Sequence, residues 1–215
     1  MTVSPSPAEL ELEPAEAVTV FGDRLSIVRH FTNQLALHGE ERGLIGPLEL
    51  PRLWTRHILN SGVVAPLLQP GRVGDVGTGA GLPGIVLAAA RPDVQFVLIE
   101  PMERRVTWLR EQVSELELEN VEIVRARAEE SNVDAGLDQV TARAVSAFRK
   151  LLRLTAPLTR DGGELVLMKG ANAQAEIDAA QKEMRRYKVT NARVQVLGEG
   201  VISEPTRVIR GDVRA

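Results

Sequence analysis

Hydrophobic and polar residues follow two different patterns along the 215-residue chain, and the change falls near residue 70. Before that point, apolar residues recur three or four positions apart, the period of one helix face, at Leu25, Val28, Phe31 and Leu35. A second helical stretch covers residues 50–68 and stops at a Pro-Gly pair. We therefore expect a helical extension over residues 19–70.

Beyond residue 71, short apolar runs alternate with amphipathic stretches. The runs predict buried strands at residues 72–77, 94–100, 121–127, 137–145 and 162–170. The stretches between them predict helices at residues 82–91, 102–118, 148–159 and 172–187. Strands that alternate with helices favour a parallel sheet covered on both faces.

Two further extended segments, 188–198 and 206–213, have no helix between them. Parallel neighbours would need a crossover, so we expect an antiparallel pair at one edge. The predicted fold over residues 71–215 is thus α/β, with a mostly parallel sheet and an antiparallel C-terminal edge.

Charge is unevenly distributed along the chain, whose net charge is −3. Residues 1–18 contain four glutamates, several prolines and no Lys or Arg, so we expect a disordered acidic tail there. The remainder is slightly basic, with paired cations at 104/105, 125/127 and 149/150. From Lys182 onward, eight Lys and Arg face four acids. A polyanionic partner is therefore compatible with the composition, although basic clusters alone discriminate poorly.

Composition also excludes several kinds of chemistry. The chain has no cysteine, which rules out disulfides and cysteine nucleophiles. Its three histidines, His30, His38 and His57, lack the i, i+4 spacing of a helical metal site, so no bound metal is expected. No window holds the roughly 18 apolar residues of a membrane span, and the N-terminus does not read as a secretory signal. We expect a soluble, cytoplasmic protein.

The sequence VGDVGTGAGLPG, residues 73–84, follows the first predicted strand. Gly77 and Gly79 can adopt positive φ and bring the backbone against a ligand. Leu82 stands where the next helix opens. The second strand ends about twenty residues later at Glu100, placed to accept hydrogen bonds from ribose hydroxyls. These features together predict a nucleoside site.

Two cofactor classes fit this site. Residues 79–84 match the G-x-G-x-x-G pattern of nicotinamide dehydrogenases, but that match alone is weak. S-adenosylmethionine (SAM) carries no phosphate, and its amino group calls for a nearby acid, which Asp75 could supply directly or through water. The helical extension before the motif and the antiparallel ending after it favour SAM. A nicotinamide dehydrogenase stays an alternative.

A family resemblance is carried by DVGTGAGLPG at 75–84, the run from Ala90 to Glu130, ARA at 142–144, LMKG at 167–170 and RHILNS at 56–61. With these motifs the chain resembles the bacterial 16S rRNA guanine-N7 methyltransferases, historically called glucose-inhibited division protein B. The resemblance runs from about Trp54 to Gly170. It implies a class I SAM-dependent, Rossmann-like fold. It also implies methylation of one guanine of the decoding region, position 527 in standard rRNA numbering, in 16S rRNA or the 30S ribosomal subunit. We expect the protein to be a monomer.

By position, the family's cofactor contacts fall on Gly77, Leu82, Ala128, Glu129 and Arg143, with Glu100 as the acid that holds the ribose. Three cations at or near predicted strand ends are the candidates for positioning the reaction, namely Arg127, Arg143 and Lys169.

Guanine N7 carries a free lone pair and no proton, so its methylation requires no general base. The chain also lacks the Asn/Asp-Pro-Pro-aromatic segment typical of amino-group methylation. Catalysis then reduces to orientation, which can supply about 7 to 11 kcal/mol. A donor on N7 would occupy the reacting lone pair, so Arg143 and Arg127 should instead contact guanine O6, a phosphate or the cofactor carboxylate. We expect His57 to be structural.

Only 3% of the residues are aromatic, so recognition should rely on phosphates and RNA shape. The cations at 104, 105, 127, 149 and 150 and in the C-terminal segment are expected to form a salt-sensitive footprint. Two further alternatives remain at this point. One is a SAM enzyme acting on a small molecule or a protein, and the other is a catalytically silent RNA-binding module.

Overall fold

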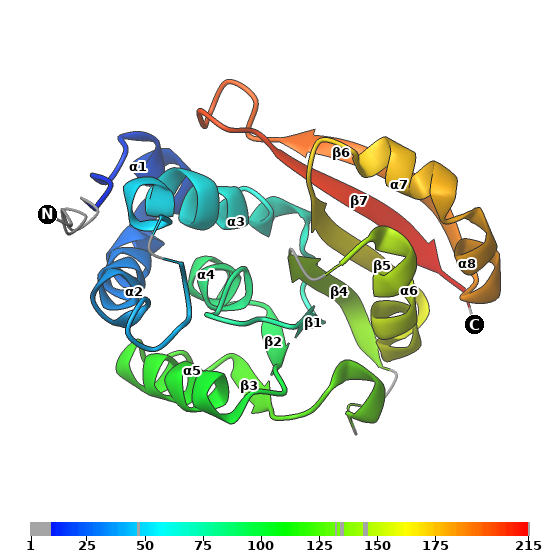
Figure 1. Cartoon of the computed structure of the whole chain (residues 1–215), viewed down its shortest axis with the longest axis horizontal. Helices are drawn as coiled ribbons and strands as arrows, with labels where there is room; N and C mark the ends of the chain where they lie inside the picture. Colours follow the sequence, from blue (N-terminus) through cyan, green and yellow to red (C-terminus); the bar gives the residue numbers. More distant parts are fainter. Residues whose placement is uncertain (1–9, 47, 132, 134–135, 144–145, 215) are drawn as a thin grey trace, which may run out of the picture.

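A computed structural model describes residues 10–46, 48–131, 133, 136–143 and 146–214. Within them the strands form one sheet in the order β3-β2-β1-β4-β5-β7-β6 (Figure 1). The strands are β1 (Arg72–Val76), β2 (Gln95–Ile99), β3 (Val121–Val124), β4 (Leu137–Arg143), β5 (Thr159–Lys169), β6 (Val189–Leu197) and β7 (Thr206–Val213). The first five are parallel, and β7 runs antiparallel to both β5 and β6. The mostly parallel sheet and its antiparallel C-terminal edge are confirmed.

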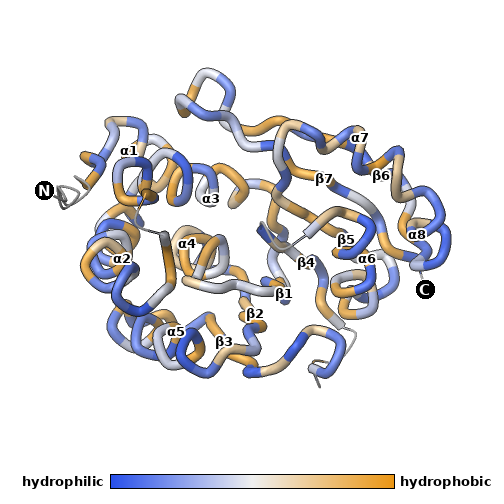
Figure 2. The backbone as a smooth tube through the Cα atoms, viewed as in Figure 1, coloured by the Kyte–Doolittle hydropathy of each residue, from blue (hydrophilic) through white to orange (hydrophobic). Residues whose placement is uncertain are grey.

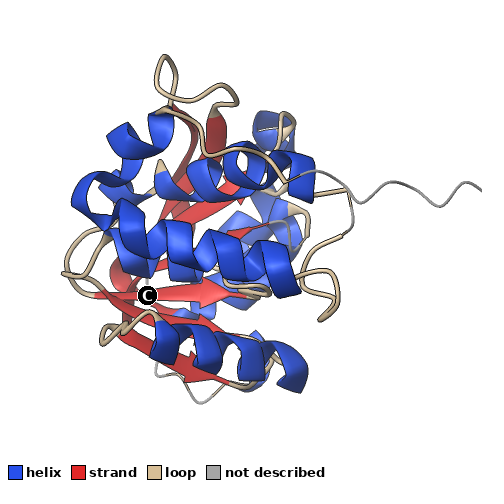
Figure 3. Ribbon diagram, turned by 90° about the vertical axis from the view of Figure 1, so that its left-hand side faces the viewer, coloured by secondary structure: helices blue, strands red, loops and turns tan. Residues whose placement is uncertain are grey.

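Helices cover both faces of the sheet (Figure 3). The helices are α1 (Glu16–Phe21), α2 (Leu25–His38), α3 (Asn60–Gly62), α4 (Gly84–Ala90), α5 (Glu103–Glu115), α6 (Phe148–Thr155), α7 (Ala173–Ala179) and α8 (Gln181–Arg186). One hydrophobic cluster joins α1, α2, α4 and α5 to the sheet, and a second joins α6 and α7 to its other face. None of these described helices is both long and apolar enough to cross a membrane.

Strand β2 shows why the sequence reads as continuous apolar runs. Phe96 and Leu98 belong to the first cluster, whereas Val97 and Ile99 belong to the second. Side chains alternate across a strand, so a strand buried on both faces is apolar at nearly every position (Figure 2). The predicted strands were therefore recognisable without an alternating pattern.

The N-terminal segment differs from the disordered tail predicted for residues 1–18. From residue 10 the structure describes an ordered chain, in which Glu13 forms a two-bonded ion pair with Arg29 at 2.5 and 2.8 Å. Helix α1 then buries Ala17 and Phe21 against the extension. These apolar anchors offset the entropy of ordering the acidic residues around them. Residues 1–9 lie outside the described residues.

The second stretch of the extension is less regular than the single helix predicted over 50–68. It begins with a 3₁₀ turn at Leu50–Arg52, continues as a π-helix over Leu53–Leu59 and ends in α3. A π-helix is rare and is found frequently at functional sites. Here it carries Arg56 and His57 to the carboxyl edge of the sheet, as described below.

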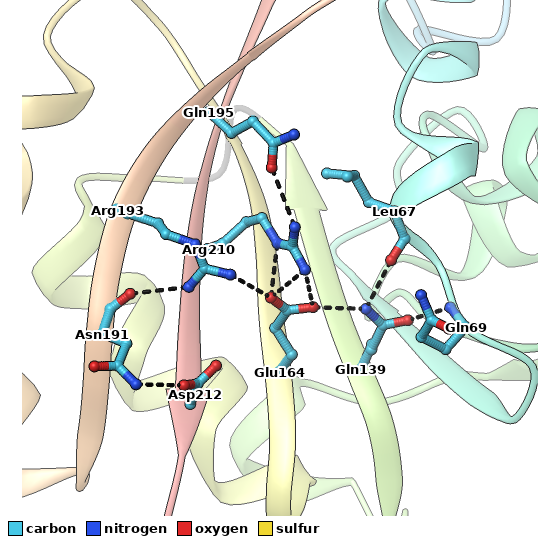
Figure 4. A network of polar contacts seen from close by, with 9 residues as sticks. All are labelled: Leu67, Gln69, Gln139, Glu164, Asn191, Arg193, Gln195, Arg210 and Asp212. Atoms are coloured by element: carbon cyan, nitrogen blue, oxygen red, sulfur yellow. Dashed lines mark hydrogen bonds and ion pairs between the residues drawn. The ribbon is translucent and has the colours of Figure 1, made fainter.

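A polar network fastens the extension to the sheet (Figure 4). The carboxylate of Glu164 on β5 accepts hydrogen bonds from Arg210 on β7 and from Gln139 on β4. Gln139 in turn donates to the carbonyl of Leu67 and accepts from the backbone of Gln69, at 3.1 and 2.7 Å. The end of the extension is thereby tied to β4, β5 and β7.

Candidate active site

The loop between β1 and α4 depends on glycines at three positions. Gly77, Gly79 and Gly81 have φ values of +70°, +60° and +99°, a region that other residues rarely adopt. The Gly77 amide donates to the carbonyl of Ile99 at 2.9 Å, which fixes the start of the loop at the end of β2. A Cβ atom at Gly79 would come no closer than 3.8 Å to any neighbour, so the loop is open on that side.

Asp75 lies behind this loop. Its carboxylate is fully buried, and Oδ2 accepts a hydrogen bond from the Gly84 amide at 2.9 Å. Burial raises the pKa of Asp75 to about 6. Asp75 thus fastens the start of α4 beneath the glycine loop. Asp75 is not among the residues that line the hollow over this loop, and its predicted contact with the amino group of a cofactor, directly or through water, stays a prediction.

Glu100 stands where the sequence predicts it, at the end of β2 beside the loop. Its Oε2 accepts from the Gly79 amide and its Oε1 from the Met102 amide, both at 3.0 Å. The carboxylate is almost fully buried, yet an ionised carboxylate can accept about four hydrogen bonds. Accepting capacity for ribose hydroxyls therefore remains, and that role stays a prediction.

A first hollow of about 260 Å³, here called the loop cleft, opens over the glycine loop. It is lined by Leu44, Ile45, Gly46, Glu49, His57, Gly77, Thr78, Gly79, Ala80, Leu82 and Arg143. The strand order reverses between β1 and β4, the point at which α/β sheets bind ligands. Sequence reasoning identified Gly77, Gly79, Leu82 and Arg143. It missed the wall formed by Leu44, Ile45, Gly46 and Glu49, which show no helical period or motif.

A second hollow of about 350 Å³, here called the strand-end cleft, adjoins the first. Its lining residues are Arg56, His57, Asn60, Arg143, Met168, Lys169, Gly170, Glu204, Pro205, Thr206 and Arg207. His57 and Arg143 line both hollows, so the two clefts meet at these side chains. A reaction between two molecules needs such a junction, because the reacting atoms must approach within about 3 to 3.5 Å.

Arg143 ends β4 and faces both clefts. Its Nη1 lies 3.5 Å from the carbonyl oxygen of Arg56, a long contact that leaves most of its donors for a ligand. Burial lowers the pKa of Arg143 to about 10, so the guanidinium remains charged near neutral pH.

Lys169 and Arg127, the other two candidates, have different surroundings. The ammonium group of Lys169 lies 2.8 Å from Oε2 of Glu176 and 2.8 Å from the carbonyl of Ser146. Its side chain is only 9% exposed, so Lys169 is paired and held in place at the wall of the strand-end cleft. Arg127 is exposed and lies outside the lining of both clefts.

Ala128 and Glu129 begin a 3₁₀ turn that follows β3 after residues 125–127. Ala128 is buried, whereas the exposed Glu129 lies 3.8 Å from Arg153. Strand β3 neighbours β2, so this turn lies at the same edge of the sheet as Glu100. A contact with adenine at this turn stays a prediction.

His57 is held by Glu49. Nε2 of His57 and Oε2 of Glu49 are 2.5 Å apart, and Oε1 of Glu49 accepts from Arg52 at 2.7 Å. Burial and the charge of Arg143 lower the pKa of His57 to about 4, so the imidazole is neutral near pH 7. For Glu49, burial acts to raise the pKa, but the hydrogen bonds from Arg52 and His57 outweigh it and lower the pKa.

The basic residues do not form a single footprint. Arg104, Arg105, Arg127, Arg149 and Lys150 follow the ends of parallel strands and lie near the carboxyl edge of the sheet. Because β7 is antiparallel to β5, with Arg207 opposite Lys169, only the start of β7 reaches that edge. Other C-terminal cations, Arg186, Lys188 and Arg214, line a separate hollow of about 310 Å³ near the other ends of the strands.

Among the described residues, no cluster of three His, Asp or Glu could hold a metal ion. The polar groups around the loop cleft suit an organic cofactor. It offers positive-φ backbone at Gly77 and Gly79 for close approach, an arginine for a carboxylate and an acid for an ammonium group. These groups fit the methionine end of SAM.

Comparisons with known proteins agree with this geometry. The family described as rRNA small subunit methyltransferase G matches residues 24–205. A protein of Leifsonia xyli subsp. xyli named ribosomal RNA small subunit methyltransferase G is 74% identical over 205 residues, covering 95% of this chain and 98% of that protein. A protein of Clavibacter michiganensis subsp. michiganensis with the same name is 63% identical, with 97% and 99% coverage.

Solved structures show the same fold at low sequence identity. The M. jannaschii TYW2 structure, in complex with AdoMet, is similar with a TM-score of 0.59 and 19% identity, covering 74% of this chain and 76% of that one. The tRNA (m1A58) methyltransferase TrmI from Aquifex aeolicus is similar with a TM-score of 0.57 and 15% identity, covering 73% and 68%. The expected class I methyltransferase fold is confirmed.

Proposed function

The chain belongs to the rRNA small subunit methyltransferase G family, and on that premise we propose that it transfers a methyl group from SAM to N7 of one guanine, position 527, in 16S rRNA. The observation that carries this proposal is the junction of the two clefts at His57 and Arg143. One cleft adjoins the cofactor loop, and the other opens to the surface along the ends of β4 and β5. At such a junction, a nucleobase nitrogen in one cleft can approach the methyl group of a cofactor in the other, in line with the bond from the methyl carbon to the leaving sulfur.

On the cofactor side, the role of the protein is to bind and orient SAM. Gly77 and Gly79 allow the backbone to approach the ligand, and Glu100 at the end of β2 is suited to the ribose hydroxyls. Arg143 is suited to the carboxylate of the methionine end, because its guanidinium is charged and has few protein partners. When bound, SAM supplies an electrophilic methyl carbon on its sulfonium.

On the substrate side, the strand-end cleft offers cations for the RNA. Arg56 and Arg207 line this cleft and are exposed at its rim. Their guanidinium groups are therefore accessible to RNA phosphates. Lys169 is already paired with Glu176, so we assign it to shaping the cleft wall. We assign Arg127 to the part of the protein surface outside the clefts that would contact RNA, because it is exposed and lines neither cleft.

No group at the junction has to move a proton. N7 of guanine reacts through its lone pair, and the neutral His57 has its Nε2 engaged by Glu49. Orientation of N7 toward the methyl group then accounts for the catalysis. The rate of the chemical step should vary little between pH 7 and 9 once binding is saturated.

We further propose that the protein acts in the cytoplasm as a monomer on the 30S subunit. Size-exclusion chromatography with light scattering, at the concentration used for the activity assay, measures this directly. Activity that depends on a dimer would contradict it.

The function is tested by incubating the protein with methyl-labelled SAM and 30S subunits that lack the modification. Label mapped to N7 of guanine 527 supports the proposal, and label elsewhere or none overturns it. Full activity on a free small molecule or protein would favour that alternative substrate class. A rise in the unfolding temperature with NAD but not with SAM would indicate a dehydrogenase. RNA binding without methyl incorporation would indicate a catalytically silent RNA-binding module.

A further inference from the structure

The loop cleft has charged walls of opposite sign. Of the residues that line it, Glu49 is the acid and Arg143 is the arginine, while His57 between them is neutral near pH 7. Glu49 comes from the N-terminal extension and Arg143 from the end of β4. The cleft therefore presents a negative group and a positive group from two different parts of the fold.

The carboxylate of Glu49 is held in one orientation. His57 contacts Oε2 and Arg52 contacts Oε1, which fixes both oxygens. These bonds use two of about four lone-pair positions, so accepting capacity remains. The Glu49 side chain is 22% exposed and lines the cleft, unlike the fully buried Asp75.

The negative charge of Glu49 is only partly compensated. The neutral imidazole of His57 adds no positive charge. Arg52 does carry one, but its side chain is 44% exposed, and solvent weakens its pull. Arg56 is 3.9 Å away and also half exposed. A cation that enters the cleft would therefore be attracted by the Glu49 carboxylate, whose negative charge the nearby arginines neutralise only in part.

We propose that Glu49 and Arg143 form a clamp for the zwitterionic amino-acid end of the cofactor. In this arrangement Glu49 accepts hydrogen bonds from the α-ammonium group and Arg143 donates to the α-carboxylate. His57 is a positioning residue that holds Glu49. The N-terminal extension is then part of the cofactor site, and the inference rests on the cofactor being SAM, as the proposed function has it.

The test compares three ligands by isothermal titration calorimetry. S-adenosylhomocysteine has the complete amino-acid end, its deaminated analogue lacks only the ammonium group, and 5′-methylthioadenosine lacks the whole end. The intact protein should bind S-adenosylhomocysteine at least about tenfold more tightly than the deaminated analogue, the scale of one charge-assisted hydrogen bond. If the intact protein binds both equally, the clamp is wrong.

The variant Glu49→Gln should remove this preference. It should weaken the binding of S-adenosylhomocysteine about tenfold or more. The affinities for both other ligands should stay within about twofold of those of the intact protein. Equal weakening of all three ligands would assign Glu49 a purely structural role and overturn the clamp. Unchanged binding of all three would overturn it as well.

Two controls keep the result interpretable. Glu41→Gln removes an exposed carboxylate from the same extension and should leave all three affinities unchanged. Glu49→Asp keeps the charge and should retain part of the ammonium preference, so it replaces Glu49→Gln if that variant does not fold. Failure of the intact protein to bind any of the ligands would contradict the proposed cofactor itself, an outcome distinct from loss of the preference.

Discussion

Arg210 on β7 donates two hydrogen bonds to Glu164 on β5, from Nε at 2.7 Å and from Nη2 at 2.9 Å. Both side chains are largely buried, and Glu164 also accepts from Gln139 on β4. This pair joins the parallel part of the sheet to its antiparallel edge (Figure 4). Its effect on stability should be large, because removal of the Glu164 charge leaves the largely buried Arg210 guanidinium with the uncharged Gln195 amide as its remaining hydrogen-bond partner.

Glu164→Gln should lower the free energy of unfolding by about 2 to 4 kcal/mol, since the Arg210 guanidinium would lose its counter-charge. Urea unfolding followed by circular dichroism measures the change. Arg193→Gln is the matched control, because Arg193 contacts the same carboxylate at 3.4 Å from an exposed position. Its expected effect is within about 0.5 kcal/mol. Equal losses for the two variants would contradict this reading of the network.

Two neighbouring glycines of the loop should respond differently to alanine. At Gly79 a Cβ atom has space but must adopt φ +60°, so Gly79→Ala should cost about 1 kcal/mol of stability. Because Gly79 lines the loop cleft, the added methyl group should weaken SAM binding at least tenfold.

At Gly81 a Cβ atom would lie 2.6 Å from Cγ1 of Ile85, inside the core. Gly81→Ala should therefore unfold at a markedly lower temperature than Gly79→Ala. Thermal unfolding and calorimetric SAM titration of both variants separate the two effects. Greater destabilisation at Gly79 than at Gly81 would refute the assigned roles.

The pKa of His57 predicts a specific acid response. A pKa lowered to about 4 from 6.5 means that the unfolded chain binds a proton between these values while the folded chain does not. Stability from this group is thus fully present above pH 6.5 and is lost as pH falls toward 4, by about 3 kcal/mol in total. Asp75, with its pKa raised to about 6, acts in the opposite direction in the overlapping range.

Because the two groups oppose each other, the measurement must isolate His57. NMR titration of its imidazole should show the neutral form at pH 6 and a midpoint near 4. The stability of His57→Gln should fall less between pH 6.5 and 4.5 than that of the intact protein. A midpoint near 6.5 would show that the imidazole is not desolvated.

Arg56 at the rim of the strand-end cleft should contribute to the salt dependence of RNA binding. Arg56→Gln should reduce the slope of log K against log salt by about one unit, because one phosphate contact is lost. Arg72→Gln is the control, since the Arg72 side chain is about as exposed as that of Arg56, 45% against 51%, but Arg72 starts β1 at the opposite edge of the sheet. Filter binding to 30S subunits at several salt concentrations gives the slopes. Equal slopes for both variants would exclude Arg56 from the interface.

The fold was predictable from sequence because most of its strands are buried on both faces. The continuous apolar runs that produce β2 and β5 appear directly in the sequence, and the absence of a helix between residues 198 and 206 indicated the antiparallel edge. Helix boundaries were less accurate. The stretch predicted as one helix over 172–187 divides at Ala180, which lies between the end of α7 and the start of α8.

The site was only partly predictable, because some of its contacts join residues distant in sequence. A motif identifies Gly77 and Gly79 but does not reveal that Asp75 points behind the loop toward Gly84. Lys169 is recognisable as a strand-end cation, whereas its ion pair with Glu176 depends on how α7 packs. Glu49 belongs to no sequence motif or periodic pattern, and only the folding of the extension brings it into contact with His57.

The antiparallel direction of β7 has a practical consequence. The strand enters beside the clefts at Thr206 and leaves at Val213, near the hollow lined by Arg214 on the other side of the sheet. A fluorophore or an affinity handle attached close to Arg214 would therefore lie away from the two clefts. Labels for single-molecule or pull-down work are best placed at this end of β7.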